Sequence, residues 1–385
     1  MALVPEYKVR VLKLDDFDEK NIATWEELEQ RAIEPNGYLS PHFVIPATKH
    51  ILSEKSVLGI LVEKVNRGGL PQLAGIGIFQ ECRASKHFPL PHLTAFSSRH
   101  SLLSGLLVDR DSAEYAVRHI FDQICRFNNK WHGLVFHDQP NEGELTIIEK
   151  EVTKDIGIKW GNFREWNRPV LCLKALKEGT SPVLGKSMKK SIHHSMRRLK
   201  EMGQVDWRIL YKEKLTETAL NRFMFLENLG WKGKEHTSLL SNYTDKNFFL
   251  EMMGNFSKSE RAFITELTLD ERPISSTVNF TSGGAGFAFK IGWDPLYAKF
   301  SPGTLNEASW LESNDPFICD LNFVDSGSSD DSSYLSKLWN QKRAMRSGVY
   351  AISGAGKFVL PFISFAAKAK NNFRNDKKQH KNLHS

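Results

Sequence analysis

Three short apolar runs separated by tight turns, followed by a Ser-Pro-Gly step, constrain the fold of this chain more than any other feature. The runs cover residues 262–269, 274–281 and 286–293, and the turns between them read "DERP" and "SGGA". Turns of this composition are typical of hairpins. The pattern predicts an antiparallel meander whose last strand leads through Ser301-Pro302-Gly303 into a helix that ends near residue 313.

The Ser-Pro-Gly step has the composition of a helix start that binds an anion. Pro302 suits the first helical position because its missing N–H is not needed there, and Ser301 is a favourable N-cap. Gly303 lets a ligand approach the backbone closely. The N–H groups of Gly303, Thr304 and Leu305 would then face a pyrophosphate at the positive end of the helix dipole. A helix start without a ligand is the alternative interpretation.

The periodicity around the meander predicts two units of α+β type. In the second half we expect, besides the meander, helices over 187–202, 215–229, 242–256 and 334–345, and strands over 205–211 and 317–324. The first half repeats this order loosely, with a helix over 113–127, a buried strand over 132–138 and two strand candidates over 156–163 and 168–176. We expect an N-terminal unit over 1–180, a C-terminal unit over 181–348 and a tail over 349–385.

The composition narrows the class of protein. With 385 residues, 41% hydrophobic and 25% charged, the chain is of the folded globular type and long enough for two cores. Its four cysteines lie far apart without a C-x-x-C pair, so we expect neither a disulfide framework nor a metal. The start turns acidic before any apolar run forms, and the apolar run over 358–367 is too short to span a bilayer. We therefore expect a cytosolic protein.

The net charge of +7 favours anionic partners, and the charge is uneven. A basic stripe lies on the helix over 187–202 and its approach, and it contains Lys186, Lys189, Lys190, His193, Arg197 and Lys200. The tail carries apolar residues up to Phe365 and then basic residues from Lys368. Such a tail can lie on an anionic membrane surface, or it can pack its apolar part on the body of the protein. The stripe can equally be a solvated helix face.

Three segments together resemble a known family. They are "SMRRLKEMGQV" (195–205), "GWKGKEHTSLL" (230–240) and "GWDPLYAKFSPGTL" (292–305). In this order they resemble acyltransferases of the CelD type from cellulose biosynthesis, a group of the GNAT superfamily that is similar to FemAB transferases in having two tandem GNAT-like units. The resemblance implies mixed sheets flanked by helices. It also implies that Trp231, Lys232 and Gly233 lie near the reaction cleft and that Ser301, Pro302 and Gly303 hold the donor.

The sequence also departs from the family. The Q/R-x-x-G-x-G/A pattern of GNAT proteins is absent, and the loop between Asp320 and Trp339 is enlarged and rich in Ser and Asp. The donor therefore stays open between acetyl-CoA, another acyl-CoA and an aminoacyl-tRNA.

Acyl transfer needs a base, a group that polarises the acyl carbonyl, and positioning of the two reactants. Asp320 lies in a predicted buried strand and is a candidate base, or else a structural carboxylate. Lys290 and Lys232 are candidates for contact with an anionic donor or a developing charge, and Glu227 for orienting the acceptor. Among the aromatic residues, Trp231 is either a core residue or a lid over a sugar ring or acyl chain, and Trp339 is a candidate for substrate contact. Asp294 precedes a proline, so it either contacts substrate or forms the turn.

We expect an enzyme that transfers an acyl group, most simply from acetyl-CoA, to an amino or hydroxyl group of a carbohydrate or cell-envelope precursor. This acceptor class comes from the resemblance alone. One alternative is a FemAB-like transferase that uses aminoacyl-tRNA, in which the basic helix would contact RNA. Another is a binding protein that kept the fold without catalysis.

Overall fold

The computed structural model of the chain describes residues 6–65, 70–179, 184–328, 334–339 and 341–363. The chain divides into two compact units. The first contains residues 1–41, 54–166 and 344–385, and the second contains 42–53 and 167–343. The predicted boundaries after 180 and 348 cut the chain into consecutive stretches, whereas these units exchange segments.

The first unit is built on a mixed sheet in which β1, β2, β3 and β4 are successive antiparallel neighbours, β6 is parallel to β4, and β13 is antiparallel to β6. β5 pairs with β3, and β7 follows β13. The strands are β1 (Glu6–Lys13), β2 (Val57–Val65), β3 (Gln72–Cys82), β4 (His92–Ala95), β5 (Leu107–Val108), β6 (Gly133–Pro140), β7 (Lys159–Cys172) and β13 (Gln341–Ala351).

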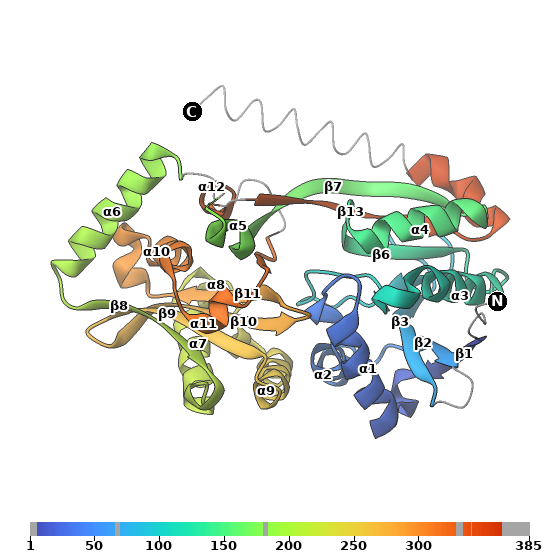
Figure 1. The fold of residues 1–385 in the computed structure, drawn as a ribbon, viewed down its shortest axis with the longest axis horizontal. Helices are drawn as coiled ribbons and strands as arrows, with labels where there is room; N and C mark the ends of the chain where they lie inside the picture. Colours follow the sequence, from blue (N-terminus) through green and yellow to red (C-terminus); the bar gives the residue numbers. More distant parts are fainter. Residues whose placement is uncertain (1–5, 66–69, 180–183, 329–333, 340, 364–385) are drawn as a thin grey trace. The chain divides into compact units, whose positions relative to one another are not determined.

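The helices of the first unit are α1 (Glu19–Arg31), α3 (Ala113–Cys125) and α4 (Glu144–Asp155) (Figure 1). α3 packs on β2 and β3 through an apolar face that includes Ala116, Ile120 and Ile124, all fully buried. This spacing of three to four residues is the period of an amphipathic helix, so α3 forms as the sequence predicts.

The second unit has a sheet of the same design. β8, β9, β10 and β11 are successive antiparallel neighbours, and β12 is parallel to β11. The last residues of β7 pair with β12. The strands are β8 (Val205–Tyr211), β9 (Ala262–Leu269), β10 (Arg272–Ser282), β11 (Ala285–Trp293) and β12 (Phe323–Asp325). The meander and the strand over 205–211 are thus confirmed.

Helices cover both faces of this second sheet. On β11, Gly292 faces α7, and its neighbour Ile291 contacts Gly303 at the start of α10. Because successive residues of a strand point to opposite faces, α7 and α10 lie on opposite sides. The helices are α2 (Pro41–His50), α5 (Leu173–Lys177), α6 (Lys186–Lys200), α7 (Glu217–Leu229), α8 (Trp231–Lys234), α9 (Tyr243–Lys258), α10 (Pro302–Ser309), α11 (Pro316–Cys319) and α12 (Leu335–Leu338).

The two units repeat one topology, which confirms the predicted duplication. In each, four antiparallel strands lead into a helix and then a strand parallel to the fourth: β4, α3 and β6 in the first unit, and β11, α10 and β12 in the second. The class is mixed α/β, with sheets flanked by helices.

Four predicted elements are wrong. The segment 317–324 is not one strand, because Asp315 caps a short helix that Pro316 begins, and β12 starts only at Phe323. The two strand candidates over 156–163 and 168–176 are one strand, β7, followed by α5. The helix expected over 334–345 ends at Leu338, and β13 follows from Gln341.

The predicted tail over 349–385 begins inside β13 and continues as a helix over 354–363. Its basic part, from Lys368 onward, lies outside the described residues. Within the described ranges, no helix has both the length and the apolar character that crossing a bilayer requires.

Candidate active site

The fourth and fifth strands of the second unit separate after a short stretch of pairing. β12 pairs with β11 only through residues 285–287, while β11 continues to Trp293. A β-bulge at Phe289 interrupts the register between β11 and β10. Beyond residue 287, no described strand pairs with β11 on its β12 side. Backbone groups on that edge are therefore available to a ligand that carries amides.

A buried carboxylate with two lysines lies beside this edge. Glu227, on α7, has a fully buried side chain. Its Oε1 lies 3.0 Å from Lys232 Nζ and 3.9 Å from Lys290 Nζ, and its Oε2 accepts a hydrogen bond of 2.9 Å from the Leu239 N–H. Lys232 also donates to the Ile291 carbonyl at 2.9 Å. The structure thus brings together three of the residues that the sequence singled out.

Packing explains why these distant residues meet. Gly292 lies against α7 so closely that a Cβ there would be 2.7 Å from the Glu227 backbone. A side chain at Gly233 would collide with the Asn228 carbonyl. Both glycines therefore allow α7 and α8 to approach, which places Glu227 over Lys290 and Lys232. The cluster carries one negative and two positive charges.

The start of α10 differs in part from the prediction. Ser301 is the N-cap, but it has a left-handed backbone with φ of 54° and its side chain makes no capping bond. The Leu305 N–H donates to the Ser301 carbonyl, so it is not free for an anion, and the Leu305 side chain is in the core. Pro302 and Gly303 are buried, and a Cβ on Gly303 would lie 3.2 Å from Ile291 Cδ1. Gly303 therefore serves close packing on β11, and Gly303 and Thr304 remain as the N–H donors of this helix start.

Positive charge flanks this helix start. Arg198 of α6 and Lys299 both lie over the Phe300 ring, 5.7 Å and 5.0 Å from its centre. The first turn of α10 contains no acidic residue. The dipole and the two cations together favour an anion at this point.

The expectation that Asp320 lies in a buried strand is wrong. Asp320 is exposed at the C-terminal end of α11. The buried carboxylate of this segment is Asp325 on β12, which lies 3.4 Å from both Arg168 Nη1 and Arg343 Nη1. The argument from burial for Asp320 as a base therefore no longer applies, and Asp325 fixes the end of β12.

Three further candidates have clear surroundings. Trp231 is 55% exposed, so it is not a core residue. Asp294 accepts a hydrogen bond from the Leu296 N–H and pairs with Arg272 at 3.0 Å, which makes it a turn former in the structure. Trp339 is buried in the hydrophobic cluster that also contains Trp310 and Leu338.

Sequence reasoning missed a buried acid on α10. Glu307 is 3% exposed, and its Oε1 accepts a hydrogen bond of 2.6 Å from the Thr277 hydroxyl. Its Oε2 is buried and has no hydrogen-bond partner among the described residues. Burial raises the pKa of Glu307 to about 7. The helical spacing from Gly303, four residues earlier, was a signal that Glu307 would face the sheet.

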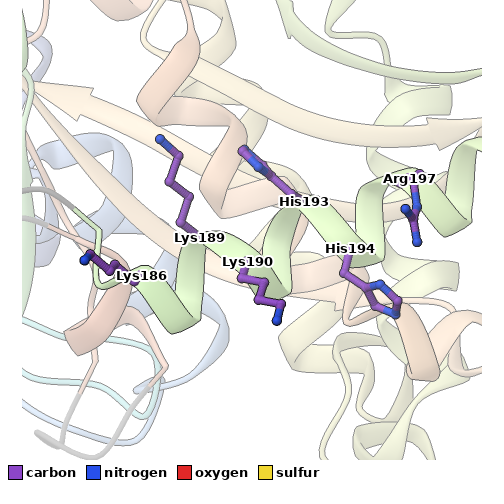
Figure 2. Close-up of a pocket in the computed structure, with 6 residues that line it drawn as sticks. All are labelled: Lys186, Lys189, Lys190, His193, His194 and Arg197. Atoms are coloured by element: carbon purple, nitrogen blue, oxygen red, sulfur yellow. The ribbon is translucent and has the colours of Figure 1, made fainter.

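The basic helix α6 is exposed along one side (Figure 2). It contains six Lys and Arg residues, two His and no acidic residue, and Leu199 is its one fully buried residue. Figure 2 shows Lys189 and His193 projecting to one side and Lys190 and His194 to the other. Of its cations, Arg197 has an acidic neighbour, Glu201 at 3.9 Å. No group of three or more His, Cys, Asp or Glu side chains in the described residues is arranged to hold a metal ion.

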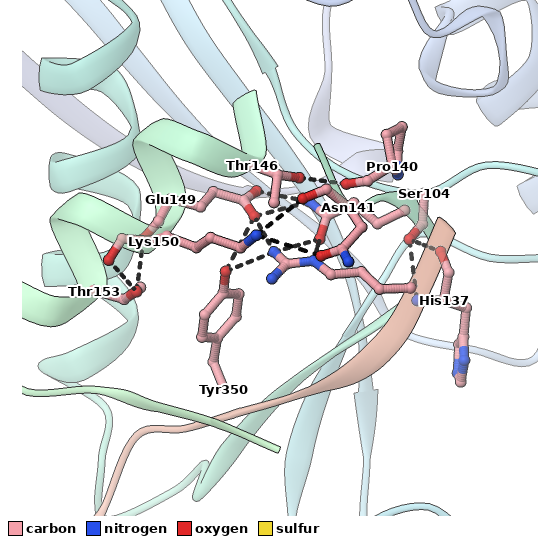
Figure 3. A network of polar contacts seen from close by, with 11 residues as sticks. Ser104, His137, Pro140, Asn141, Thr146, Glu149, Lys150, Thr153 and Tyr350 are labelled. Atoms are coloured by element: carbon pink, nitrogen blue, oxygen red, sulfur yellow. Dashed lines mark hydrogen bonds and ion pairs between the residues drawn. The ribbon is translucent and has the colours of Figure 1, made fainter. Parts of the chain in front are cut away.

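In the first unit, a loop residue bonds to the fifth strand just beyond its short pairing with the fourth. β6 pairs with β4 at residues 134–135, and then the loop residue Ser104 bonds to both the N–H and the carbonyl of His137 (Figure 3). The start of α3 also carries negative charge, since Asp109 accepts a hydrogen bond from the Asp111 N–H and pairs with Arg31. The Asp111 N–H is thus occupied by the protein's own carboxylate and is not free to bind a phosphate.

A buried polar network completes the first unit. Glu149 accepts hydrogen bonds from Gln139, Arg346 and Tyr350 at 2.8–3.2 Å, with Glu149 and Tyr350 drawn in Figure 3. Burial raises the pKa of Glu149 to about 7, against the lowering effect of Arg346 and Gln139. The network fills the space between α4, β6 and β13 with the protein's own side chains.

Comparison with known proteins gives one match to a family model, over part of the second unit. Residues 186–313 match the family model described as "Acetyltransferase (GNAT) domain". The second unit thus contains a GNAT-type acyltransferase domain. Domains of this kind use acyl-CoA. No curated protein sequence matches the chain.

Solved structures share the fold over nearly the whole chain. FemX has a TM-score of 0.56 at 10% identity, over 86% of this chain and 96% of its own. A conserved protein of unknown function from Bacteroides thetaiotaomicron has 0.55 at 7%, over 89% and 100%. The C-terminal domain (DUF2156) of a lysylphosphatidylglycerol synthetase candidate from Agrobacterium fabrum has 0.53 at 9%, over 90% and 95%. Identities this low show the fold alone.

Proposed function

We propose that the chain is an acyltransferase that moves an acyl group from an acyl-CoA, most simply acetyl-CoA, to an amino or hydroxyl group. The observation that carries the proposal is the separated edge of β11, with α10 starting at its end and the Glu227, Lys232 and Lys290 cluster beside it. The same residues lie within the segment that matches the GNAT model.

The donor is proposed to bind along β11 and at the start of α10. The N–H groups of Gly303 and Thr304, with Arg198 and Lys299 beside them, offer hydrogen bonds and positive charge for a pyrophosphate. Ser301 and Pro302 set the direction of this turn, and Leu305 supports it from the core. The unpaired edge beyond residue 287 offers backbone groups for the amides of the pantetheine arm.

The bound thioester supplies an activated acyl carbon. In the reaction the acceptor nitrogen or oxygen bonds to that carbon, the carbon–sulfur bond breaks, and the acceptor proton ends on the released thiol. We assign to Lys290 the positive charge that stabilises the developing oxyanion, because it follows the bulge at Phe289. Glu227 holds Lys232 and Lys290 in place. Trp231 is proposed to contact the acceptor, since its ring is exposed next to Lys232. Gly233 allows α8 to pack against the Asn228 carbonyl. Asp294 is proposed to hold the turn after β11, and Trp339 to pack in the hydrophobic cluster beneath the site.

The acceptor is proposed to be a carbohydrate or cell-envelope precursor. The support is the resemblance of 195–205, 230–240 and 292–305 to the CelD type. A lipid-linked precursor would suit peripheral membrane contact, and the helix over 354–363 exposes Phe358 (74%) and Phe362 (65%) with ring centres 6.1 Å apart. Sedimentation with anionic vesicles that is lost in a Phe358→Ser, Phe362→Ser variant would support peripheral membrane contact, which we propose for the cytoplasmic face.

The proposal is tested by calorimetric titration with acetyl-CoA. We expect micromolar binding that is weakened at least tenfold in an Arg198→Ala, Lys299→Ala variant. A matched variant, Arg126→Ala, Lys154→Ala, removes the same charges from exposed positions of the first unit and should bind as the wild type does. Thiol release that depends on an added amino sugar or polysaccharide then tests turnover. If no acyl-CoA binds, the donor assignment is wrong.

Two alternatives are tested by the same set of ligands. The exposed cations of α6 favour an aminoacyl-tRNA donor as the second candidate. Salt-sensitive binding of charged tRNA, with no binding of acyl-CoA, would support it. Donor binding without turnover on any acceptor would support a binding protein.

A further inference from the structure

A groove of about 270 Å³ runs between α6 and α10 in the second unit. Six of its eleven lining residues are apolar, three are basic, one is acidic and one is a serine. The apolar residues are Leu184, Ile192, Met196, Leu305, Ala308 and Leu311. Lys189, His193 and Lys200 provide the basic rim from α6, and Ser309 and Glu312 lie on the opposite rim. No ion pair joins Lys189 or Lys200 to a carboxylate among the described residues, so both are available to an anion.

The groove leads toward the start of α10. Near the end of α6, Leu199 packs in one cluster with Phe300 and Leu305, which flank the start of α10. Near the beginning of α6, Leu184 lines the groove together with Leu311, which follows the end of α10. The two helices are therefore antiparallel, and the end of the groove that Lys200 and Leu305 line lies within one turn of Gly303.

The size of the groove suits one end of an extended ligand. Sites that hold a whole small molecule usually have about 300–1,000 Å³. A groove just below that range, with apolar walls and a cationic rim, fits a flat heterocycle together with a phosphate.

We infer that this groove binds the adenosine 3′-phosphate end of coenzyme A. The adenine ring would lie between the apolar side chains of α6 and α10, and the 3′-phosphate would lie at Lys189 and Lys200. This inference rests on the proposed function, because it continues the donor from the start of α10 outward. It makes Lys189 and Lys200 the residues that distinguish coenzyme A from dephospho-coenzyme A.

The geometry of α6 provides a matched control. Lys189 and His193 project to the same side in Figure 2, whereas Lys190 projects to the other. Lys186 and Lys190 do not line the groove, although they belong to the same helix and are equally exposed. Removing Lys186 and Lys190 lowers the charge of α6 by the same amount without changing the groove.

The experiment measures the dissociation constants of coenzyme A and dephospho-coenzyme A with the full chain by calorimetry. We expect the wild type to prefer coenzyme A by at least tenfold. A Lys189→Gln, Lys200→Gln variant should lose this preference, and a Lys186→Gln, Lys190→Gln variant should keep it. Met196→Trp fills the groove and should weaken both ligands at least fivefold while the circular dichroism spectrum stays unchanged.

Two outcomes would overturn the inference in different ways. If coenzyme A binds and the preference survives in the Lys189→Gln, Lys200→Gln variant, the groove assignment alone is wrong. The same holds if the control variant loses the preference equally, because the effect is then one of general charge. If the wild type binds neither ligand, both the assignment of coenzyme A as donor and the assignment of the groove are wrong.

Discussion

Replacing Glu307 by Gln is expected to remove a pH dependence from the stability of the second unit. The carboxyl has a pKa of about 7 in the folded chain against 4.5 as the ordinary value. Between these values the folded state binds a proton that the unfolded state has lost, so stability falls as pH rises from about 4.5 to 7. At about 1.4 kcal/mol per pH unit, the shift costs the wild type about 3 kcal/mol at pH 8 relative to pH 4. The Thr277 hydroxyl can still donate to the amide oxygen of Gln.

The assay is urea unfolding of both proteins at pH 4.5 and pH 8, followed by tryptophan fluorescence. The two should differ little at pH 4.5, and Glu307→Gln should gain about 3 kcal/mol relative to the wild type by pH 8. Glu213→Gln controls for the loss of one exposed negative charge in the same unit. A difference between wild type and Glu307→Gln that is the same at both pH values would refute the reasoning.

Three further substitutions test the packing around the site by the same unfolding assay. Glu227→Ala removes the buried carboxylate that pairs with Lys232 and Lys290 and accepts the hydrogen bond of the Leu239 N–H, and it should cost about 3 kcal/mol; an unchanged stability would mean that the cluster is not formed. Asp325→Asn should cost a similar amount because it breaks a buried ion pair with two arginines. The exposed Asp320→Asn should change stability by no more than about 0.5 kcal/mol. Equal effects of the two substitutions would contradict the finding that Asp325, and not Asp320, is the buried carboxylate. Gly292→Ala should cost about 2 kcal/mol through the clash with α7, against almost nothing for Gly354→Ala, which meets open space.

Local chemistry made part of the fold predictable. The meander over 262–293 consists of short apolar runs separated by hairpin turns, so sequence and structure agree there. The start of α10 at Pro302 followed from the preference of proline for the first helical position. The set of free N–H donors differs from the prediction, because the Leu305 N–H donates to the Ser301 carbonyl.

The remainder depends on partners that are distant along the chain. β13 begins with the polar residues Gln341, Lys342 and Arg343, and its part from Met345 to Ala351 pairs with β6, some two hundred residues earlier. The Glu227 cluster depends on the close approach of α7 to Gly292, which no local pattern reveals. Asp320 and Asp325 both follow apolar residues, and the cap at Asp315 was the available signal that a helix would intervene.

The exchange of segments has a consequence for how the chain is made. During synthesis the first unit has all of its other strands early, yet β6 keeps one edge open until β13, near the end of the chain, is available. α2 is synthesised early, but the second unit on which it packs is synthesised later. An open strand edge is a template for pairing with other chains, so the nascent protein is vulnerable to aggregation throughout this interval. Cutting the chain at its midpoint would give two fragments, neither of which contains a complete unit. We therefore expect neither fragment to fold by itself.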